Sequence, residues 1–326
     1  MAQHLYSGGS SKTEKTRAAG IIKADLDYVT EHWTDLGFDL WEEVKAHHFY
    51  TRLVQRKALL AGAQLADLLG DSSHAKKYKD AAQKLETVIA THWLPLGSPT
   101  PSKTQSTGLI WDSFDRERGI DYKRTGLDAA VVLAALHSHD DFDEPHDRFF
   151  SPSDDRILKT AWELAKAFQK EYLLAKSEVK NANLGVPIGR YPGDKYNGYD
   201  SSQAGNPWYL TTLAFAELYY RCAEEWLAQD FISVTPVNKE FLKTLTKKNL
   251  KEGEIISKKD PRFGELTSAI QELGDSYIRR VQYHEGPGPH FTEEYSRIDG
   301  SPQGAKDLSW SYASLLTAAQ HRRLAR

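Results

Sequence analysis

The chain has 326 residues, of which 40% are apolar and 27% are charged, an ordinary composition for a globular protein with a sizeable core. Its formal net charge of −3 provides no basic face for nucleic acid or for an anionic membrane. The single cysteine, Cys222, excludes an intrachain disulfide, and no run reaches the 18 or more apolar residues of a membrane span.

The hydrophobic pattern is helical almost throughout. Apolar residues recur three and four positions apart, which predicts about eight long helices, and no run alternates convincingly with a period of two. The predicted helices span residues 21–33, 46–69, 73–93, 127–136, 153–174, 207–226, 265–281 and 306–323. Gly70 is typical of a helix end, while the run Ser153-Asp154-Asp155 and the residue Asn206 are typical of helix caps. The pattern predicts one all-α domain over residues 21–326, after a polar start over residues 1–20.

Three long connections separate these helices, over residues 94–124, 175–205 and 282–305. Loops of this length are uncommon in compact helical domains and usually carry function. They also contain aromatic, glycine and acidic clusters. We therefore expect these loops to carry functional residues.

The octapeptide over residues 37–44, Gly-Phe-Asp-Leu-Trp-Glu-Glu-Val, puts Trp41 beside Asp39, Glu42 and Glu43. An indole ring can stack on a sugar and can also remove water from a neighbouring carboxyl, which favours acid/base catalysis on a sugar. Acids in the first turn of a helix also interact well with the positive end of the helix dipole. For this segment alone, ordinary helix-start charge is an equally good interpretation.

Splitting a glycosidic bond requires a second carboxylate, and the candidate is Glu293 in the segment His-Phe-Thr-Glu-Glu-Tyr. Taken alone, Glu293 and Glu294 are more simply interpreted as loop acids. Neither acid pair accompanies a His-x-x-x-His or Asp-x-Asp pattern, so metal binding is a weaker interpretation and no metal is predicted. The adjacent His47 and His48 cannot share a helix face, which indicates structural or solvent-facing roles.

A third cluster contains Arg190, Asp194, Tyr196 and Trp208. The planar arginine fork suits vicinal hydroxyls or carboxylates, and the aromatic rings offer stacking faces. An internal salt bridge between Arg190 and Asp194 in a structural loop is an equally good interpretation. Farther along the chain, Trp310 is predicted to pack against its surroundings.

Taken in order, four motifs of this chain resemble those of the fungal glucoamylases, glycoside hydrolase family 15. They are the octapeptide at 37–44, Gly-Arg-Tyr-Pro-x-Asp at 189–194 with Asn-Pro-Trp at 206–208, Glu-Glu-Tyr at 293–295, and Lys-Asp-Leu-Ser-Trp-Ser-Tyr-Ala at 306–313. The resemblance implies an all-α fold, the six-fold α/α barrel, with long loops at the active-site face. It also implies release of β-glucose from the non-reducing ends of starch, glycogen and maltooligosaccharides by inversion, without a cofactor.

Position by position, the resemblance implies that Glu42 is the general acid and Glu293 the general base that activates water. The glucose subsites would be lined by Asp39, Leu40 through its backbone, Trp41, Glu43, Arg190, Asp194, Tyr196 and Trp208. Glu42 must stay protonated near the working pH, which burial against Trp41 would favour. Inversion requires a gap of roughly 6.5–9.5 Å between the two carboxyl groups.

The chain departs from the family pattern before the first motif. Family members have helices and a glucose-binding Arg-Asp pair there, and nothing in residues 1–23 replaces them. Residues 1–20 are therefore expected to be a disordered or non-homologous start, and residues 21–326 a partial catalytic domain of this family. The resemblance therefore predicts an incomplete barrel of about eight of twelve helices, whose exposed apolar flanks cause self-association. Two other interpretations stay open: an inactive remnant or α-glucan-binding protein, and another α/α-barrel glycosidase such as a trehalase or glucodextranase relative.

The sequence leaves the cellular compartment open. Residues 1–20 lack the apolar core of a secretory signal, and the chain contains no Asn-x-Ser/Thr sequon. As written, the chain reads as intracellular, whereas members of the resembled family are often secreted or vacuolar.

Overall fold

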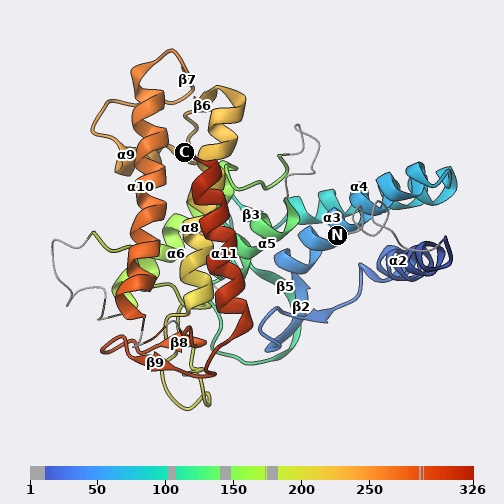
Figure 1. Cartoon of the computed structure of the whole chain (residues 1–326), viewed down its shortest axis with the longest axis horizontal. Coiled ribbons are helices and arrows are strands. Elements are labelled where there is room, and N and C mark those ends of the chain that lie inside the picture. Colours follow the sequence, from blue (N-terminus) through green and yellow to red (C-terminus); the bar gives the residue numbers. More distant parts are fainter. Residues whose placement is uncertain are drawn as a thin grey trace.

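The computed structural model describes residues 12–101, 108–139, 148–172, 174, 183–285, 288 and 290–326, with side chains from residue 20 onward. The described chain is mostly helical (Figure 1). Its helices are α2 (Lys12–His32), α3 (Phe49–Leu68), α4 (Ser72–Ala90), α5 (Ala130–Ser138), α6 (Asp155–Glu171), α8 (Tyr209–Gln229), α9 (Lys239–Leu245), α10 (Pro261–His284) and α11 (Ser309–Leu324). Each predicted helix corresponds to one of these, and α9 was not predicted. The domain boundary at residue 20 stays a prediction, and residues 1–11 lie outside the described residues.

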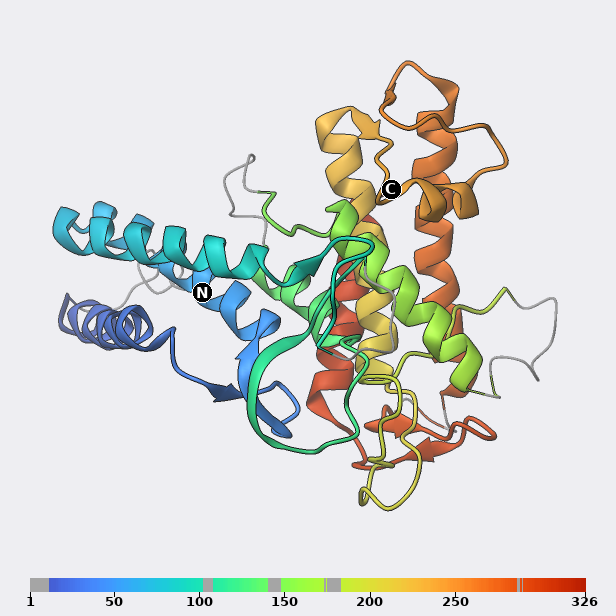
Figure 2. The same cartoon turned by 180° about the vertical axis from the view of Figure 1, so that it is seen from behind.

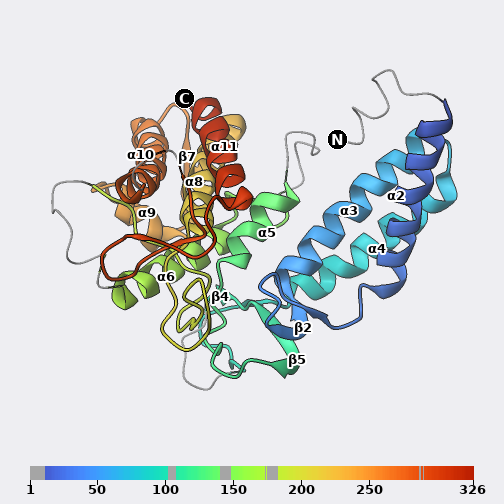
Figure 3. The same cartoon turned by 60° about the horizontal axis from the view of Figure 1, so that its bottom comes forward.

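Alternate helices form an inner row. Along this row α3 contacts α5, α5 contacts α8, and α8 contacts α11, while α4, α6 and α10 pack behind α3, α5 and α8. Helix α5 is almost entirely buried, and α8 is buried continuously from Tyr209 to Ala223. In Figure 3, α5 lies between α3 on one side and α8 and α11 on the other. Inner and outer helices thus alternate along the chain, as predicted for an α/α fold.

Local sequence explains where several helices begin and end. Asp71, Asp154 and Asp260 each accept a hydrogen bond from a backbone N–H two or three residues farther on, which satisfies a donor of the first helical turn. Gly70 follows α3 with a φ of 79°, a left-handed value that glycine adopts without strain. The predicted capping role of Asn206 is wrong, because α8 begins at Tyr209 and the Asn206 side chain donates a hydrogen bond to Glu294 of a distant strand.

The sequence pattern predicts no strand, and this prediction is wrong at β2 (Val44–His48). This strand pairs with β1 (Gly37–Phe38) and β5 (Ser113–Gly119) in an antiparallel sheet of order β1-β2-β5. Side chains in β2 alternate between buried and half-buried, but five residues are too few to reveal that period in the sequence. The strand takes the place of the predicted start of α3. Its partner β5 comes from a predicted loop, so pairing between distant segments decides the structure here.

The remaining strands form short antiparallel pairs. These are β3 (Trp93–Leu94) with β4 (Leu109–Ile110), β6 (Phe231–Ser233) with β7 (Ile255–Ser257), and β8 (Glu294–Tyr295) with β9 (Pro302–Gln303). The loop before α8 and the β8–β9 hairpin lie together beyond one end of the helices, at the bottom of Figure 1. Figure 2 shows the same gathering from behind. Among the described helices, none has the length and apolar character needed to cross a membrane.

Candidate active site

The octapeptide forms the turn between β1 and β2. The backbone N–H of Asp39 donates to the Val44 carbonyl at 3.0 Å, and the N–H of Glu42 donates to the Asp39 carbonyl at 3.0 Å. The Asp39 carboxylate also accepts hydrogen bonds from the N–H groups of Glu43 at 2.7 Å and Val44 at 3.2 Å. The acids therefore lie in a hairpin turn, and their interpretation as helix-start charge is wrong.

The turn places its two adjacent glutamates differently. Glu42 has a φ of 61° and an exposed side chain, whereas Trp41 is buried and Glu43 is half-buried. The expected burial of Glu42 against Trp41 is therefore wrong. Leu40 is half-buried and packs against the main core.

Of the two adjacent glutamates, Glu43 is the one that enters a buried charge network. One of its oxygens accepts a hydrogen bond from Arg190 Nη2 at 2.7 Å, and the other accepts one from the Tyr191 hydroxyl at 2.6 Å. Arg190 also donates twice to Asp194, at 2.8 Å each, so the predicted internal salt bridge is present. Loss of hydration raises the pKa of Glu43, although the Arg190 charge and the Tyr191 hydrogen bond oppose that shift.

Aromatic rings surround this network. The ring of Trp41 lies 5.9 Å from that of Trp208 and 6.1 Å from that of Trp310, and the Tyr196 ring lies 6.0 Å from Trp208. The Arg190 guanidinium lies over the Tyr196 ring at 5.1 Å and over the Trp41 ring at 5.5 Å. Trp310 packs against the core, as predicted. The predicted aromatic residues thus converge around one arginine.

Glu293, at the residue before β8, reaches the same aromatic cluster. Its Oε2 accepts hydrogen bonds from the Tyr196 hydroxyl and from the backbone N–H of Ala305, each at 3.3 Å. Its own N–H donates to the Ala305 carbonyl at 2.9 Å, which ties the segment to the chain before α11. Glu293 is half-buried and therefore still reachable. Tyr196 and Trp208 link it to Trp41, so the two acid-bearing segments meet.

The neighbouring Glu294 is fully buried, which the sequence did not indicate. Its Oε2 accepts a hydrogen bond from Asn206 Nδ2 at 2.9 Å, and its Oε1 has no hydrogen-bond partner. Burial raises its pKa to about 9, and the nearby charges of Asp194 and Glu293 act in the same direction. Glu294 is therefore a protonated acid at neutral pH beside the candidate base.

Sequence reasoning also missed Tyr191 and Lys123. Tyr191 stands next to Arg190 in its motif, so its hydroxyl beside Glu43 could have been suspected from that position. Lys123 lies in a long connection with no motif around it, and its ammonium group bonds to Asp39 at 2.9 Å. Nothing in the local sequence signals that contact.

Other polar groups near the turn have structural partners. His48 is buried and its Nε2 lies 2.9 Å from the Val44 carbonyl, while His47 Nδ1 lies 3.0 Å from Asp115. Their predicted structural role is confirmed, on a strand instead of a helix. No group of three His, Cys, Asp or Glu side chains suited to a metal ion occurs within the described residues.

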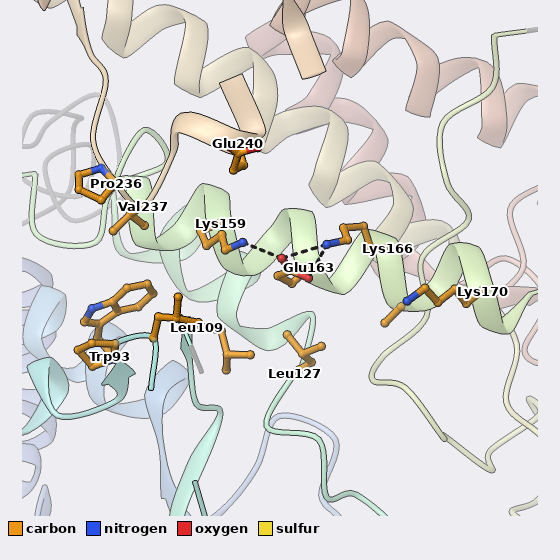
Figure 4. Close-up of a pocket in the computed structure, with 14 residues that line it drawn as sticks. Trp93, Leu109, Leu127, Lys159, Glu163, Lys166, Lys170, Pro236, Val237 and Glu240 are labelled. Carbon is orange, nitrogen blue, oxygen red and sulfur yellow. Dashed lines mark hydrogen bonds and ion pairs between the residues drawn. The ribbon is translucent and has the colours of Figure 1, made fainter. Parts of the chain in front are cut away.

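A separate cavity of about 800 Å³ lies along α6 (Figure 4). Its walls carry apolar side chains such as Trp93, Leu109 and Leu127 together with Lys159 and Lys166, which both bond to Glu163. None of the predicted site residues lines it. The cavity is therefore not part of the candidate active site.

Alternating helices and a loop-built site of carboxylates, arginine and indole rings define an α/α protein suited to a sugar ligand. The sequence model of glycosyl hydrolases family 15 matches residues 1–320. The chain belongs to glycosyl hydrolases family 15.

Individual relatives agree with this assignment. A glucoamylase of Blastobotrys adeninivorans is 38% identical, with the match covering 97% of this chain and 50% of the relative. Glucoamylase 1 of Rhizopus oryzae is 36% identical over 91% of this chain and 46% of the relative. The chain thus spans about half the length of these relatives.

Solved structures show the same likeness. The glucoamylase of Hormoconis resinae has a TM-score of 0.84 at 28% identity, covering 100% of this chain and 51% of that one. The family 15 glucoamylase of Hypocrea jecorina has a TM-score of 0.79 at 30% identity, covering 93% of this chain and 46% of that one. These likenesses confirm the predicted fold class, the (α/α)6 barrel.

Proposed function

We propose that this chain provides the catalytic carboxylates of a glucan 1,4-α-glucosidase, a glucoamylase that releases β-glucose from non-reducing chain ends by inversion. The observation that carries the proposal is the meeting of the Glu42 turn and Glu293 at one aromatic cluster, joined through Tyr196 and Trp208. Family membership and the names of the glucoamylase relatives support the same reaction. The substrate would be starch, glycogen or a maltooligosaccharide.

In this proposal Glu42 is the general acid and Glu293 the general base. An exposed Glu42 can approach the glycosidic oxygen of a bound glucan, which would itself cover the carboxyl from water. The Tyr196 hydroxyl and the Ala305 N–H orient one oxygen of Glu293, which leaves the other available to a water molecule. Glycosidic hydrolysis by inversion requires these two roles on opposite faces of the sugar.

The other predicted residues would bind and shape the sugar. The indole rings of Trp41 and Trp208 offer stacking faces, and Asp39 maintains the turn that presents Leu40. Asp194 orients Arg190, which donates a hydrogen bond to Glu43, and a sugar hydroxyl could exchange for one of these hydrogen bonds. Tyr196 would complete the wall.

The proposal is tested by following maltotriose hydrolysis with NMR of the glucose anomers. The unchanged protein should release β-glucose, and Glu42→Gln or Glu293→Gln should lower kcat by about 10²- to 10⁴-fold, because each removes a proton-transfer group. Glu272→Gln, an exposed acid of α10, is the matched control and should keep full activity. Initial release of α-glucose, or undiminished activity in Glu42→Gln, would refute the mechanism.

A second candidate is an α-glucan-binding protein without catalysis. The exposed position of Glu42 favours it, because a general acid is usually kept protonated by burial. Saturable maltotriose binding that Trp208→Ala weakens, with no glucose released over days, would favour this candidate. Trehalose is offered as a second substrate in the same experiment. Its hydrolysis in preference to maltotriose would indicate a trehalase-like member of the α/α-barrel glycosidases.

We also propose that the chain associates with itself through α11. Only one stripe of this helix is buried, through Ser311, Ser314, Ala318 and His321, while Leu316 on another face is exposed. An inner helix with an exposed apolar face favours association in water.

A further inference from the structure

Beneath the β1–β2 turn lies a lysine that is almost completely removed from solvent. Lys123 is 4% exposed, and three carboxylates surround its ammonium group. The Nζ atom is 2.9 Å from Asp39 and 3.4 Å from Asp112, and it forms its closest contact with Asp128. It also lies 4.7 Å from the centre of the Tyr191 ring. Lys123 is thus a single cation shared by several elements.

The carboxylates that Lys123 holds act on the turn by separate routes. Asp39 accepts the N–H groups of Glu43 and Val44, so its position sets the backbone on one side of Glu42. Asp128 accepts the indole N–H of Trp41, at 3.0 and 3.2 Å to its two oxygens, and so holds the residue on the other side of Glu42. Both flanks of Glu42 therefore depend on partners of one ammonium group.

The charge of the buried carboxylates explains why the turn depends strongly on the Lys123 ammonium group. Asp39 and Asp128 are both buried, and a buried carboxylate without a cation must either take up a proton or move toward water. Either change would alter a hydrogen bond that orients the turn. A neutral side chain of similar length at residue 123 could not replace the ammonium group.

We propose that Lys123 is a positioning residue of the candidate site, which fixes the Glu42 turn and the Trp41 ring through Asp39 and Asp128. It does not contact the ligand itself, because its ammonium group is buried among protein groups. The kinetic part of this inference rests on the proposed function. The structural part, the placement of the Trp41 indole, does not.

The placement is tested in the full chain by ¹H–¹⁵N NMR of the tryptophan indole groups, with the Trp41 signal assigned from Trp41→Phe. Lys123→Met should displace the Trp41 signal and leave that of Trp162 unchanged. The matched control is Lys159→Met, because Lys159 also pairs with a carboxylate and lies 4.6 Å from the Trp162 ring. It should displace the Trp162 signal alone. An unmoved Trp41 signal in folded Lys123→Met would overturn the inference.

A second variant covers the case in which Lys123→Met does not fold. Lys123→Met with Asp112→Asn removes one charge of each sign and leaves Asp128, the acceptor of the Trp41 indole N–H, unchanged. If Lys123 positions the turn through its contacts, the folded double variant keeps a displaced Trp41 signal. A Trp41 signal at its original position in that variant would show that Lys123 only balances charge, and the inference would be wrong.

The kinetic readout separates this inference from the proposed function. With maltotriose, Lys123→Met should lower kcat by about 10- to 100-fold while KM changes little, because a displaced acid affects the reaction more than binding. Lys159→Met should leave both constants unchanged. If the unchanged chain has no hydrolytic activity, the proposed function fails while the indole signals still decide the role of Lys123. Unchanged kcat in a folded Lys123→Met would count against positioning.

Discussion

Glu294 shows how burial alone can change the state of a carboxyl group. The side chain is fully buried, and its pKa of about 9 lies above the ordinary value of 4.5. Because the folded-state pKa is raised, the contribution of this group to stability is fully present below pH 4.5 and is lost as the pH rises toward 9. The unfolded chain can ionise freely through that window, whereas the folded chain cannot.

Glu294→Gln should therefore stabilise the protein at neutral and alkaline pH. The amide keeps an acceptor for Asn206 and does not ionise, so the gain grows with pH and reaches roughly 1–3 kcal/mol at pH 8. Urea unfolding of both proteins at pH 5 and pH 8 measures this gain in the free energy of unfolding. Glu252→Gln, an exposed acid near Lys239, is the control and should show no such growth. An equal effect of Glu294→Gln at both pH values would show that Glu294 is already ionised in the folded protein.

At the scale of elements, the sheet β1-β2-β5 supports the acid turn. Gly119 of β5 pairs with Val44 of β2 and has a φ of 120°. A Cβ atom at Gly119 would lie 2.1 Å from the Glu43 carbonyl oxygen and 2.8 Å from the Val44 Cα, both backbone atoms that have no freedom to rotate away. The strand can approach the turn this closely only because residue 119 has no side chain.

Gly119→Ala should destabilise the protein by about 2–4 kcal/mol, from backbone strain together with the clash. Gly253→Ala is a matched control, because Gly253 also has a positive φ of 83° but a Cβ there would meet nothing within 4 Å. The control should lose only about 1 kcal/mol from strain. Thermal unfolding of both variants measures the difference. If Gly119→Ala loses no more stability than Gly253→Ala, the close approach of β5 to the turn is not real.

Sequence periodicity predicted the helices better than the strands because of how each is stabilised. The apolar residues of α4 and α6 recur along one face, and their caps lie in the adjacent residues, so the information is local. β2 has five residues, and its stability comes from β5, which lies in a connection that was predicted as loop. The candidate site residues divide in the same way, into those with a local sequence signal and those without one. Arg190, Tyr196 and Trp208 were predicted from motifs, whereas Lys123 was not.

At the scale of the whole molecule, the inner row of helices ends at α11 within the described chain. Leu316 of α11 is 71% exposed, whereas α5 and α8 are buried on nearly every side. Apolar surface on an inner helix favours contact with a second apolar surface. The exposed side of α11 is thus where association is expected.

We expect the isolated chain to form dimers or larger species in sedimentation experiments over the micromolar range. Leu316→Lys should shift the distribution toward monomer, because a charged side chain resists burial in an apolar contact. Leu96→Lys is the control, since Leu96 is 83% exposed in the connection after β3 and lines the cavity along α6, which no residue of α11 lines. A clean monomer with a cooperative melt above roughly 50 °C would contradict the expectation.

The amino-acid sequence by itself indicated the family and the helical class, and it led to a proposal of which residues act on a sugar. Helical periodicity is a local property, and the ordered motifs carry the resemblance wherever they lie in space. Only the tertiary structure decided which acid of the pair is half-buried and which is exposed. Glu42 and Glu43 are adjacent residues of the same type. They differ in exposure because Arg190 and Tyr191, from a distant segment of the chain, donate hydrogen bonds to Glu43. Burial and charge partners depend on segments brought together by packing, and a linear sequence does not state those distances.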